Sequence, residues 1–289
     1  MSPLWRLLAA GALLALFSRV LFPGAAVVTI AADVEAEEWM VASREAFSNT
    51  RWEDALAPTR ALVERFPSQQ VYSDRLARIY YGLGRSADEA AAWDQFVKTS
   101  PTPEDACPAI GHAYLRAGDR QASVRAFERC KDFDPRNGEL WSFLGRAYQR
   151  ERRHNDALKA FQEGVRVDPL HSDSRIGLAS ALLMRNDATE ALTVVQPATA
   201  RVPDNPDAHL MQGLALQRLG RRGDARAALE RAAALSATYV DVHVALGVLD
   251  FTDGRFADAR ARFTRALELD PGRRMELQVW LDRLDGVAR

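Results

Sequence analysis

The chain has 289 residues, which is enough for one or two compact domains or for one elongated array with a sizeable core. Its 38 basic and 39 acidic residues give a formal net charge of -1, so no overall field attracts nucleic acid or an acidic membrane surface. Any recognition by charge must therefore be local, and we expect no nucleic-acid partner.

The first element along the chain is an apolar N-terminal segment. Arg6 precedes the run LLAAGALLALF at residues 7–17, and the stretch VLFPGAAVVTIAA follows Arg19. A basic residue followed by an apolar run of this length is typical of an export signal or a membrane anchor. We expect residues 1–32 to be a signal peptide or a transmembrane anchor. The alternative is a buried helix at the start of a cytosolic protein.

Charges on the two sides of this segment predict the side of the membrane on which the rest of the chain lies. Arginine precedes the segment and acidic residues follow it at 33–38, which favours an N-terminus in the cytoplasm and a body outside it. No cysteine follows the apolar run where a lipoprotein would need one. We expect an extracytoplasmic protein of the bacterial periplasm, which is either anchored in the inner membrane or secreted.

Three series of residues recur downstream with a period of 34, and a period of this length is typical of repeat architectures. The first series is glycine, the second is proline and the third is alanine. Their members are Gly111, Gly145, Gly213 and Gly247; Pro67, Pro101, Pro135, Pro169, Pro203 and Pro271; and Ala55, Ala157, Ala191, Ala225 and Ala259.

Each period predicts two helices of about a dozen residues, because apolar positions recur at spacings of three and four. Short turns such as RAGDR at residues 116–120 join the two helices, and the proline ends each unit. A glycine inside a helix costs about 1 kcal/mol relative to alanine. We therefore expect Gly145 and Ala157 to lie where the two helix backbones approach closely.

The residues at these positions resemble the tetratricopeptide repeat, whose pattern is W-x2-L-G-x2-Y, then A-x3-F, then P. The matching residues of one unit are Trp141, Leu144, Gly145, Tyr148, Ala157, Phe161 and Pro169. Seven units cover residues 36–271 and begin near Ala36, Gln70, Glu104, Gly138, Ser172, Pro206 and Val240. The first two units match the pattern least well.

The resemblance implies an all-α fold, a right-handed superhelical solenoid of about seven helix-turn-helix units with a concave inner face. Residues 272–289 are then the C-terminal capping helix, with Trp280 and Leu284 packed inward. An acidic residue begins most of the first helices, where it complements the helix dipole rather than forming a catalytic or metal site. These residues are Glu37, Asp105, Glu139, Asp173, Asp207 and Asp241.

Signatures of catalysis are absent from the sequence. It contains no nucleophile elbow, no phosphate-binding loop, no HExxH zinc motif and no Cys/His cluster with metal-ligand spacing. We expect a protein that is not an enzyme and that needs no cofactor or metal.

The two cysteines, Cys107 and Cys130, lie on the two predicted helices of the third unit. An antiparallel hairpin brings them to neighbouring turns, so an exported chain can join them as a disulfide worth about 3 kcal/mol. The alternative is a pair of buried thiols that pack as small apolar side chains.

The resemblance also implies a ligand site, because the groove of the family is lined by the first helices. The predicted groove residues are basic in the N-terminal half and apolar in the C-terminal half. They are Arg44, Arg75, Arg78, His112, Arg116, Arg146, Arg150, Ile176, Leu210, Leu214, Val244, Val248 and Phe251. We expect a protein or peptide ligand with acidic and hydrophobic portions. The alternative is that the arginines are solvated and the apolar side chains pack inside the solenoid.

These features predict a scaffold that assembles a protein complex on the extracytoplasmic side of a membrane and binds a peptide or helix in its groove. One alternative is a structural subunit that is present at fixed ratio in a membrane complex, and another is the accessory domain of an enzyme. Family members that bind chaperones hold a C-terminal carboxylate with asparagines and lysines, which are absent here at the matching positions.

Overall fold

The computed structural model describes residues 25–100 and 102–287 of the chain. Within these residues the chain forms fifteen α-helices and two short 3-10 helices, and no strand. The predicted all-α architecture is confirmed, whereas the handedness of the superhelix and the number of seven units stay predictions. Most of the predicted signal or anchor, residues 1–24, lies outside the described residues.

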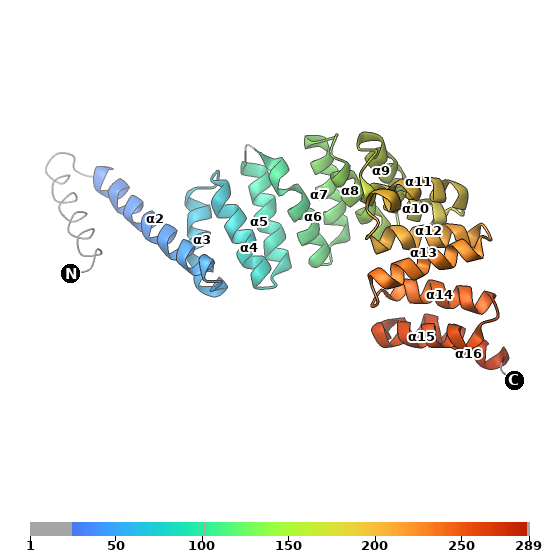
Figure 1. Ribbon diagram of the computed structural model, residues 1–289. Helices are drawn as coiled ribbons and strands as arrows, with labels where there is room; N and C mark the ends of the chain where they lie inside the picture. Colours follow the sequence, from blue (N-terminus) through green and yellow to red (C-terminus); the bar gives the residue numbers. More distant parts are fainter. Residues whose placement is uncertain (1–24, 101, 288–289) are drawn as a thin grey trace. The chain divides into compact units, whose positions relative to one another are not determined.

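Two compact units divide the chain between Phe133 and Asp134, and in each unit antiparallel helices follow one another in chain order (Figure 1). The helices of the first unit are α2 (Ala25–Ser48), α3 (Trp52–Arg65), α4 (Gln70–Gly82), α5 (Ser86–Thr99), η1 (Pro103–Ala106), α6 (Cys107–Arg116) and α7 (Arg120–Phe133). Those of the second unit are α8 (Gly138–Arg150), α9 (His154–Val167), α10 (Ser172–Met184), α11 (Ala188–Arg201), α12 (Pro206–Arg218), α13 (Arg222–Leu235), α14 (Val240–Thr252), α15 (Phe256–Leu269), η2 (Pro271–Arg273) and α16 (Arg274–Val287).

Most first helices begin at the residues that the 34-residue period predicts. Helices α4, α8, α10, α12 and α14 start at the predicted first residues of their units. Helix α2 differs, because it starts at Ala25 and passes without a break through the predicted boundary at residues 32–36. The third repeat also differs, since the 3-10 turn η1 precedes an α6 of only 10 residues.

The predicted acidic residues lie in the first turn only in the helices that start where the period predicts. Glu139, Asp173, Asp207 and Asp241 lie in the first turns of α8, α10, α12 and α14, as predicted. The prediction is wrong for Glu37, which lies inside α2, and for Asp105, which lies in η1.

Close packing explains the mid-helix glycines. A Cβ atom at Gly145 would lie 2.6 Å from the ring of Phe161, which belongs to the paired helix α9 and is fully buried. A Cβ atom at Gly247 would lie 2.8 Å from Phe263 on α15. The glycines therefore make room for a buried aromatic ring of the paired helix, which occupies the space that a side chain would need.

A further series, which has the same period of 34 residues as the three series in the sequence, marks the ends of the first helices. Seven residues at the turns adopt a positive φ, and they are Thr50, Gly84, Gly118, Arg152, Asn186, Gly220 and Gly254. A left-handed residue is a common way to end a helix, and glycine adopts it without steric cost. Three of the seven positions lack glycine, which helps to explain why the sequence pattern did not reveal this series.

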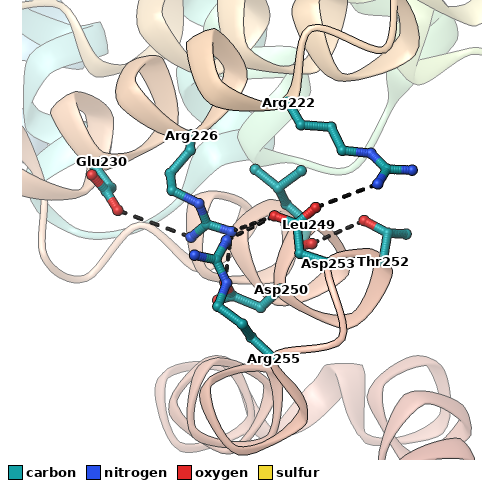
Figure 2. A network of polar contacts seen from close by, with 8 residues as sticks. All are labelled: Arg222, Arg226, Glu230, Leu249, Asp250, Thr252, Asp253 and Arg255. Carbon is teal, nitrogen blue, oxygen red and sulfur yellow. Dashed lines mark hydrogen bonds and ion pairs between the residues drawn. The ribbon is translucent and has the colours of Figure 1, made fainter.

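A polar network links α13 to α14 and to the turn that follows α14 (Figure 2). Arg226 Nη2 lies 2.8 Å from Asp250 Oδ1 and 3.0 Å from Asp253 Oδ2. Arg255 Nε lies 3.1 Å from the same Asp250 oxygen, and Arg255 Nη2 lies 2.7 Å from Asp253 Oδ2. Asp250 is buried where most other repeats have tyrosine or leucine, so two guanidinium groups compensate a carboxylate inside the array.

The C-terminal helix covers the last repeat. Leu277 and Leu284 are buried, and they form one apolar cluster with Phe263 of α15. Trp280 stacks on Phe263 with ring centroids 5.5 Å apart and an angle of 17° between the ring planes. Trp280 and Leu284 therefore pack against the array, as the predicted capping role requires.

Candidate functional site

A cavity of about 210 Å³ lies on three successive first helices of the second unit. Helix α8 contributes Arg146 and Gln149, α10 contributes Asp173, Ile176, Gly177 and Ser180, and α12 contributes Asp207 and Met211. Arg146 and Ile176 are among the predicted groove residues, and the other lining residues lie on the same three helices. First helices alone line the cavity, as expected of the inner face of a repeat array.

Charged groups in the cavity are paired unequally. Arg146 Nη1 lies 3.2 Å from Asp173 Oδ2, and the guanidinium also lies over the ring of Phe143 at 5.1 Å. Asp207 accepts a hydrogen bond from the hydroxyl of Tyr239. Burial and this carboxylate raise the pKa of Tyr239, so the phenol stays protonated and donates. Arg146 thus has an ionic partner, whereas Asp207 has a neutral one.

The arginines predicted for the basic half of the groove are also largely engaged by their own chain. Arg78 Nε lies 2.9 Å from Asp74 Oδ2, one turn earlier on α4. Arg75 donates a hydrogen bond of 2.8 Å to Ser43, and burial together with Arg44 lowers the pKa of Arg75. Arg44 itself is exposed.

Arg116 has a structural role. Its Nη2 atom lies 2.5 Å from Oε1 of Glu89, which is buried on α5 at the position where most other repeats have alanine. The guanidinium also lies 4.9 Å from the ring centre of Tyr81 on α4. Arg116 therefore links neighbouring repeats and compensates a buried charge, which is a correction to its predicted role as a free ligand contact.

The remaining predicted residues differ in exposure. Arg150 is exposed, His112 is half-buried against Phe127, and Leu214 is half-buried. Leu210 is only 2% exposed, so its prediction as a groove residue is wrong, because the side chain packs in the interior. Three further residues, Val244, Val248 and Phe251, pack against the C-terminal apolar cluster. The apolar half of the predicted groove therefore belongs largely to the core.

Family models match most of the second unit and the last part of the first unit. A model described as tetratricopeptide repeat matches residues 144–206 and 210–274, and a second model with the same description matches residues 105–137. The chain belongs to the tetratricopeptide-repeat family. No similar sequence was found among the curated proteins.

Solved structures of other tetratricopeptide-repeat proteins share the fold. The chain is similar to TTC0263, a thermophilic member from Thermus thermophilus, with 26% identity, a TM-score of 0.53, and coverage of 63% of this chain and 98% of that one. A repeat protein from Parabacteroides merdae is 15% identical with a TM-score of 0.63, covering 82% and 93%. A chain of the APC/C hetero-tetramer Cut9-Hcn1 is 15% identical with a TM-score of 0.66, covering 92% and 50%.

The disulfide of this tetratricopeptide-repeat chain lies in the third repeat. Cys107 on α6 and Cys130 on α7 are bonded, with their Cα atoms 5.4 Å apart, a separation that suits a disulfide. The equivalent residues of the next repeat are Trp141 and Gly164, and a Cβ atom at Gly164 would lie 3.3 Å from the Cβ atom of Trp141. The disulfide thus occupies a position where the two helices of a repeat already approach closely.

A second, polar cavity of about 710 Å³ lies on α5, α6 and α7 of the first unit. Arg129 Nη2 lies 2.7 Å from Asp94 Oδ1, and the hydroxyl of Tyr114 donates to the other Asp94 oxygen. Although burial opposes it, the bonds from Arg129 and Tyr114 lower the pKa of Asp94. Burial and Asp94 raise the pKa of Tyr114 to about 12. Basic and acidic groups are balanced in this cavity, so it favours no charge of ligand.

Within residues 25–100 and 102–287, no helix has both the length and the apolar character that a membrane span requires. The same part of the chain holds no group of three or more His, Cys, Asp and Glu side chains placed to bind a metal ion.

Proposed function

We propose that the chain is a scaffold that binds an extended segment of a partner protein in the cavity on α8, α10 and α12. The tetratricopeptide-repeat fold supports a protein-interaction scaffold, and proteins of this family are generally not catalysts. The observation that carries the proposal is that three successive first helices contribute side chains to one cavity. A segment that crosses the three helices meets polar and apolar groups in turn, which is how a repeat array recognises an extended ligand.

The second part of the proposal concerns location. The scaffold works outside the cytoplasm and assembles a protein complex there, after residues 1–32 have exported the chain or anchored it in a membrane. The apolar run at residues 7–17 supports this location, because it has the length of a signal segment. The pairing of Cys107 with Cys130 supports it as well, because disulfides persist in oxidising compartments.

Selection of peptides tests the binding site. Phage that display random 12-residue peptides are selected on the wild-type chain and on the variant Ser180→Trp, in which an indole fills part of the cavity. Gln196→Trp is the matched control, because Gln196 is exposed on the second helix α11 and does not line the cavity. Circular dichroism verifies that both variants keep the helicity of the wild type.

We expect peptides to be enriched on the wild type and on Gln196→Trp, and the enriched peptides to bind Ser180→Trp at least tenfold more weakly. Equal binding to all three proteins would place the ligand elsewhere and would refute the proposed site. An absence of any enrichment on the wild type would refute peptide binding itself.

A further inference from the structure

We infer that the cavity on α8, α10 and α12 takes one basic side chain, a lysine or an arginine, from the extended segment of the partner. This inference rests on the proposed function and names the chemistry of its ligand. It replaces the expectation of an acidic ligand at Arg146. Three properties of the cavity lead to it: its uncompensated charge, its apolar lining and its size.

The uncompensated charge in the cavity is negative. The guanidinium of Arg146 is neutralised by Asp173 at 3.2 Å. The carboxylate of Asp207 receives a hydrogen bond from the neutral phenol of Tyr239, and no ion pair involves it among the described residues. The dipole of α12 offsets about half an elementary charge at its N-terminus, which leaves the remainder for a ligand. A cation is therefore favoured beside Asp207.

An acidic ligand group meets two obstacles in the same place. It has to compete with Asp173 for Arg146, which is already held between that carboxylate and the ring of Phe143. It also has to lie close to Asp207, which lines the same cavity. Like charges at short range disfavour binding, so the pairing inside the cavity selects against an acidic side chain.

The apolar lining suits the stem of a basic side chain. Ile176 on α10 and Met211 on α12 line the cavity together with the two aspartates. Lysine and arginine bury their methylene groups along apolar surface while the charged end reaches a polar partner. A short polar side chain would not cover the apolar lining, and a purely apolar side chain would leave the aspartates without a partner.

The size of the cavity suits one long side chain of an extended segment. It has about 210 Å³ and is lined by residues of three helices.

The experiment compares the wild type with Asp207→Asn, which keeps the shape of the side chain and an acceptor for Tyr239 but removes the charge. Asp204→Asn is the matched control, because it changes the net charge equally at an exposed residue just outside α12 that pairs with Arg231. Phage-displayed random 12-residue peptides are selected on each protein. One enriched peptide is then synthesised with lysine, norleucine or glutamate at the preferred position, and its affinity is measured by fluorescence anisotropy.

We expect a lysine or arginine at one position of the peptides selected on the wild type and on Asp204→Asn, and no such preference on Asp207→Asn. Replacing that lysine by norleucine should weaken binding to the wild type about tenfold, which is about 1.4 kcal/mol. The same replacement should leave binding to Asp207→Asn unchanged. In a second variant, Met211→Lys, an ammonium group of the chain itself occupies the cavity, and we expect the lysine peptide to bind it at least tenfold more weakly.

Each other outcome refutes a definite part of the argument. Enriched peptides that show no basic preference, or an acidic one, overturn the inference while the proposed scaffold stands. An equal loss of the basic preference in Asp207→Asn and Asp204→Asn also overturns it, because the effect then comes from net charge alone. Failure of any peptide to be enriched on the wild type refutes the proposed function instead.

Discussion

At the scale of single residues, Gly145 shows how a position that weakens its own helix can strengthen the fold. Alanine at this position gains about 1 kcal/mol of helix propensity, but its Cβ atom would lie 2.6 Å from the buried ring of Phe161. Overpacking of this kind costs about 1–3 kcal/mol. Phe161 has little room to move, because Gly177 on α10 abuts the same ring.

We therefore expect Gly145→Ala to lower the free energy of unfolding by about 1 kcal/mol, measured by urea denaturation. Gly223→Ala is the control, because no atom lies within 4 Å of its added Cβ atom and φ there is not positive. That variant should be neutral or slightly more stable than the wild type. An increase in stability for Gly145→Ala would show that the ring moves aside without cost.

Thr50 occupies the left-handed position that four other repeats fill with glycine. Its φ is 54°, and a β-branched residue is strained in this region by about 1–2 kcal/mol. Glycine removes the strain but is more flexible in the unfolded chain, which costs about 0.5–1 kcal/mol. We expect Thr50→Gly to raise the free energy of unfolding by up to about 1 kcal/mol.

The opposite change at an equivalent turn provides the comparison. Gly84 has a φ of 68°, and Gly84→Ala should lower the free energy of unfolding, because alanine disfavours this conformation. If the two variants change urea stability in the same direction, strain at this turn does not explain the series of positive φ values.

At the scale of elements, Arg226 fixes α13 to α14 through a buried carboxylate. Arg226→Met keeps much of the apolar stem and leaves Arg255 as the ion-pair partner of Asp250 among the described residues. Removing one partner of a buried pair costs about 3–5 kcal/mol, and we expect a loss near the lower end because Arg255 remains. Burial already raises the pKa of Asp250 despite Arg226, so the variant carboxyl should bind a proton still more readily.

The pH dependence follows from this shift. Asp250 is neutral below its folded pKa, so the loss of Arg226 should matter least in acid and most at neutral pH. Urea denaturation of the wild type and Arg226→Met at several pH values measures the difference. Arg221→Met removes an exposed pair with Asp224 and should cost at most about 0.5 kcal/mol at any pH. A deficit in Arg226→Met that is independent of pH would indicate lost packing and not a lost ion pair.

How much of these elements could be predicted from sequence depends on the range of the contact. The starts of α4, α8, α10, α12 and α14 follow from spacing within one repeat, because helix period, glycine and proline all act locally. The pairing of Arg116 with Glu89 depends on side chains in two different repeats, and the 34-residue pattern does not contain that information. The prediction of Leu210 as a groove residue was wrong for the same reason, since the pattern places a residue on a face of its helix but does not show what covers that face.

The candidate site was predicted only in part, because the repeat pattern contains no information on contacts between side chains that are far apart in the sequence. Arg146 and Ile176, which the period assigns to the groove face, line the cavity. The period did not reveal that Asp173 neutralises Arg146 while Tyr239 donates to Asp207, because these partners lie 27 and 32 residues further along the chain. The sign of the free charge, and with it the expected ligand, changed once those pairs were known.

At the scale of the whole molecule, the disulfide and the N-terminal segment make one joint prediction about location. If residues 1–32 export the chain, Cys107 and Cys130 meet an oxidising compartment, and the bond adds about 3 kcal/mol to the third repeat. Cells are quenched in acid and treated with a maleimide that adds a mass to each free thiol. We expect the wild-type chain to gain no mass before reduction and two adducts after it.

A variant of the apolar run separates export from spontaneous pairing. Leu13→Arg combined with Leu14→Arg interrupts the run at residues 7–17, so the body should stay in the reducing cytoplasm and carry two adducts without prior reduction. Ser2→Arg adds a charge before the run and should behave as the wild type does. Free thiols in the wild type would refute the extracytoplasmic location. Oxidised cysteines in the interrupted variant would show that the bond forms whatever the compartment, because the repeat brings the two sulfur atoms together.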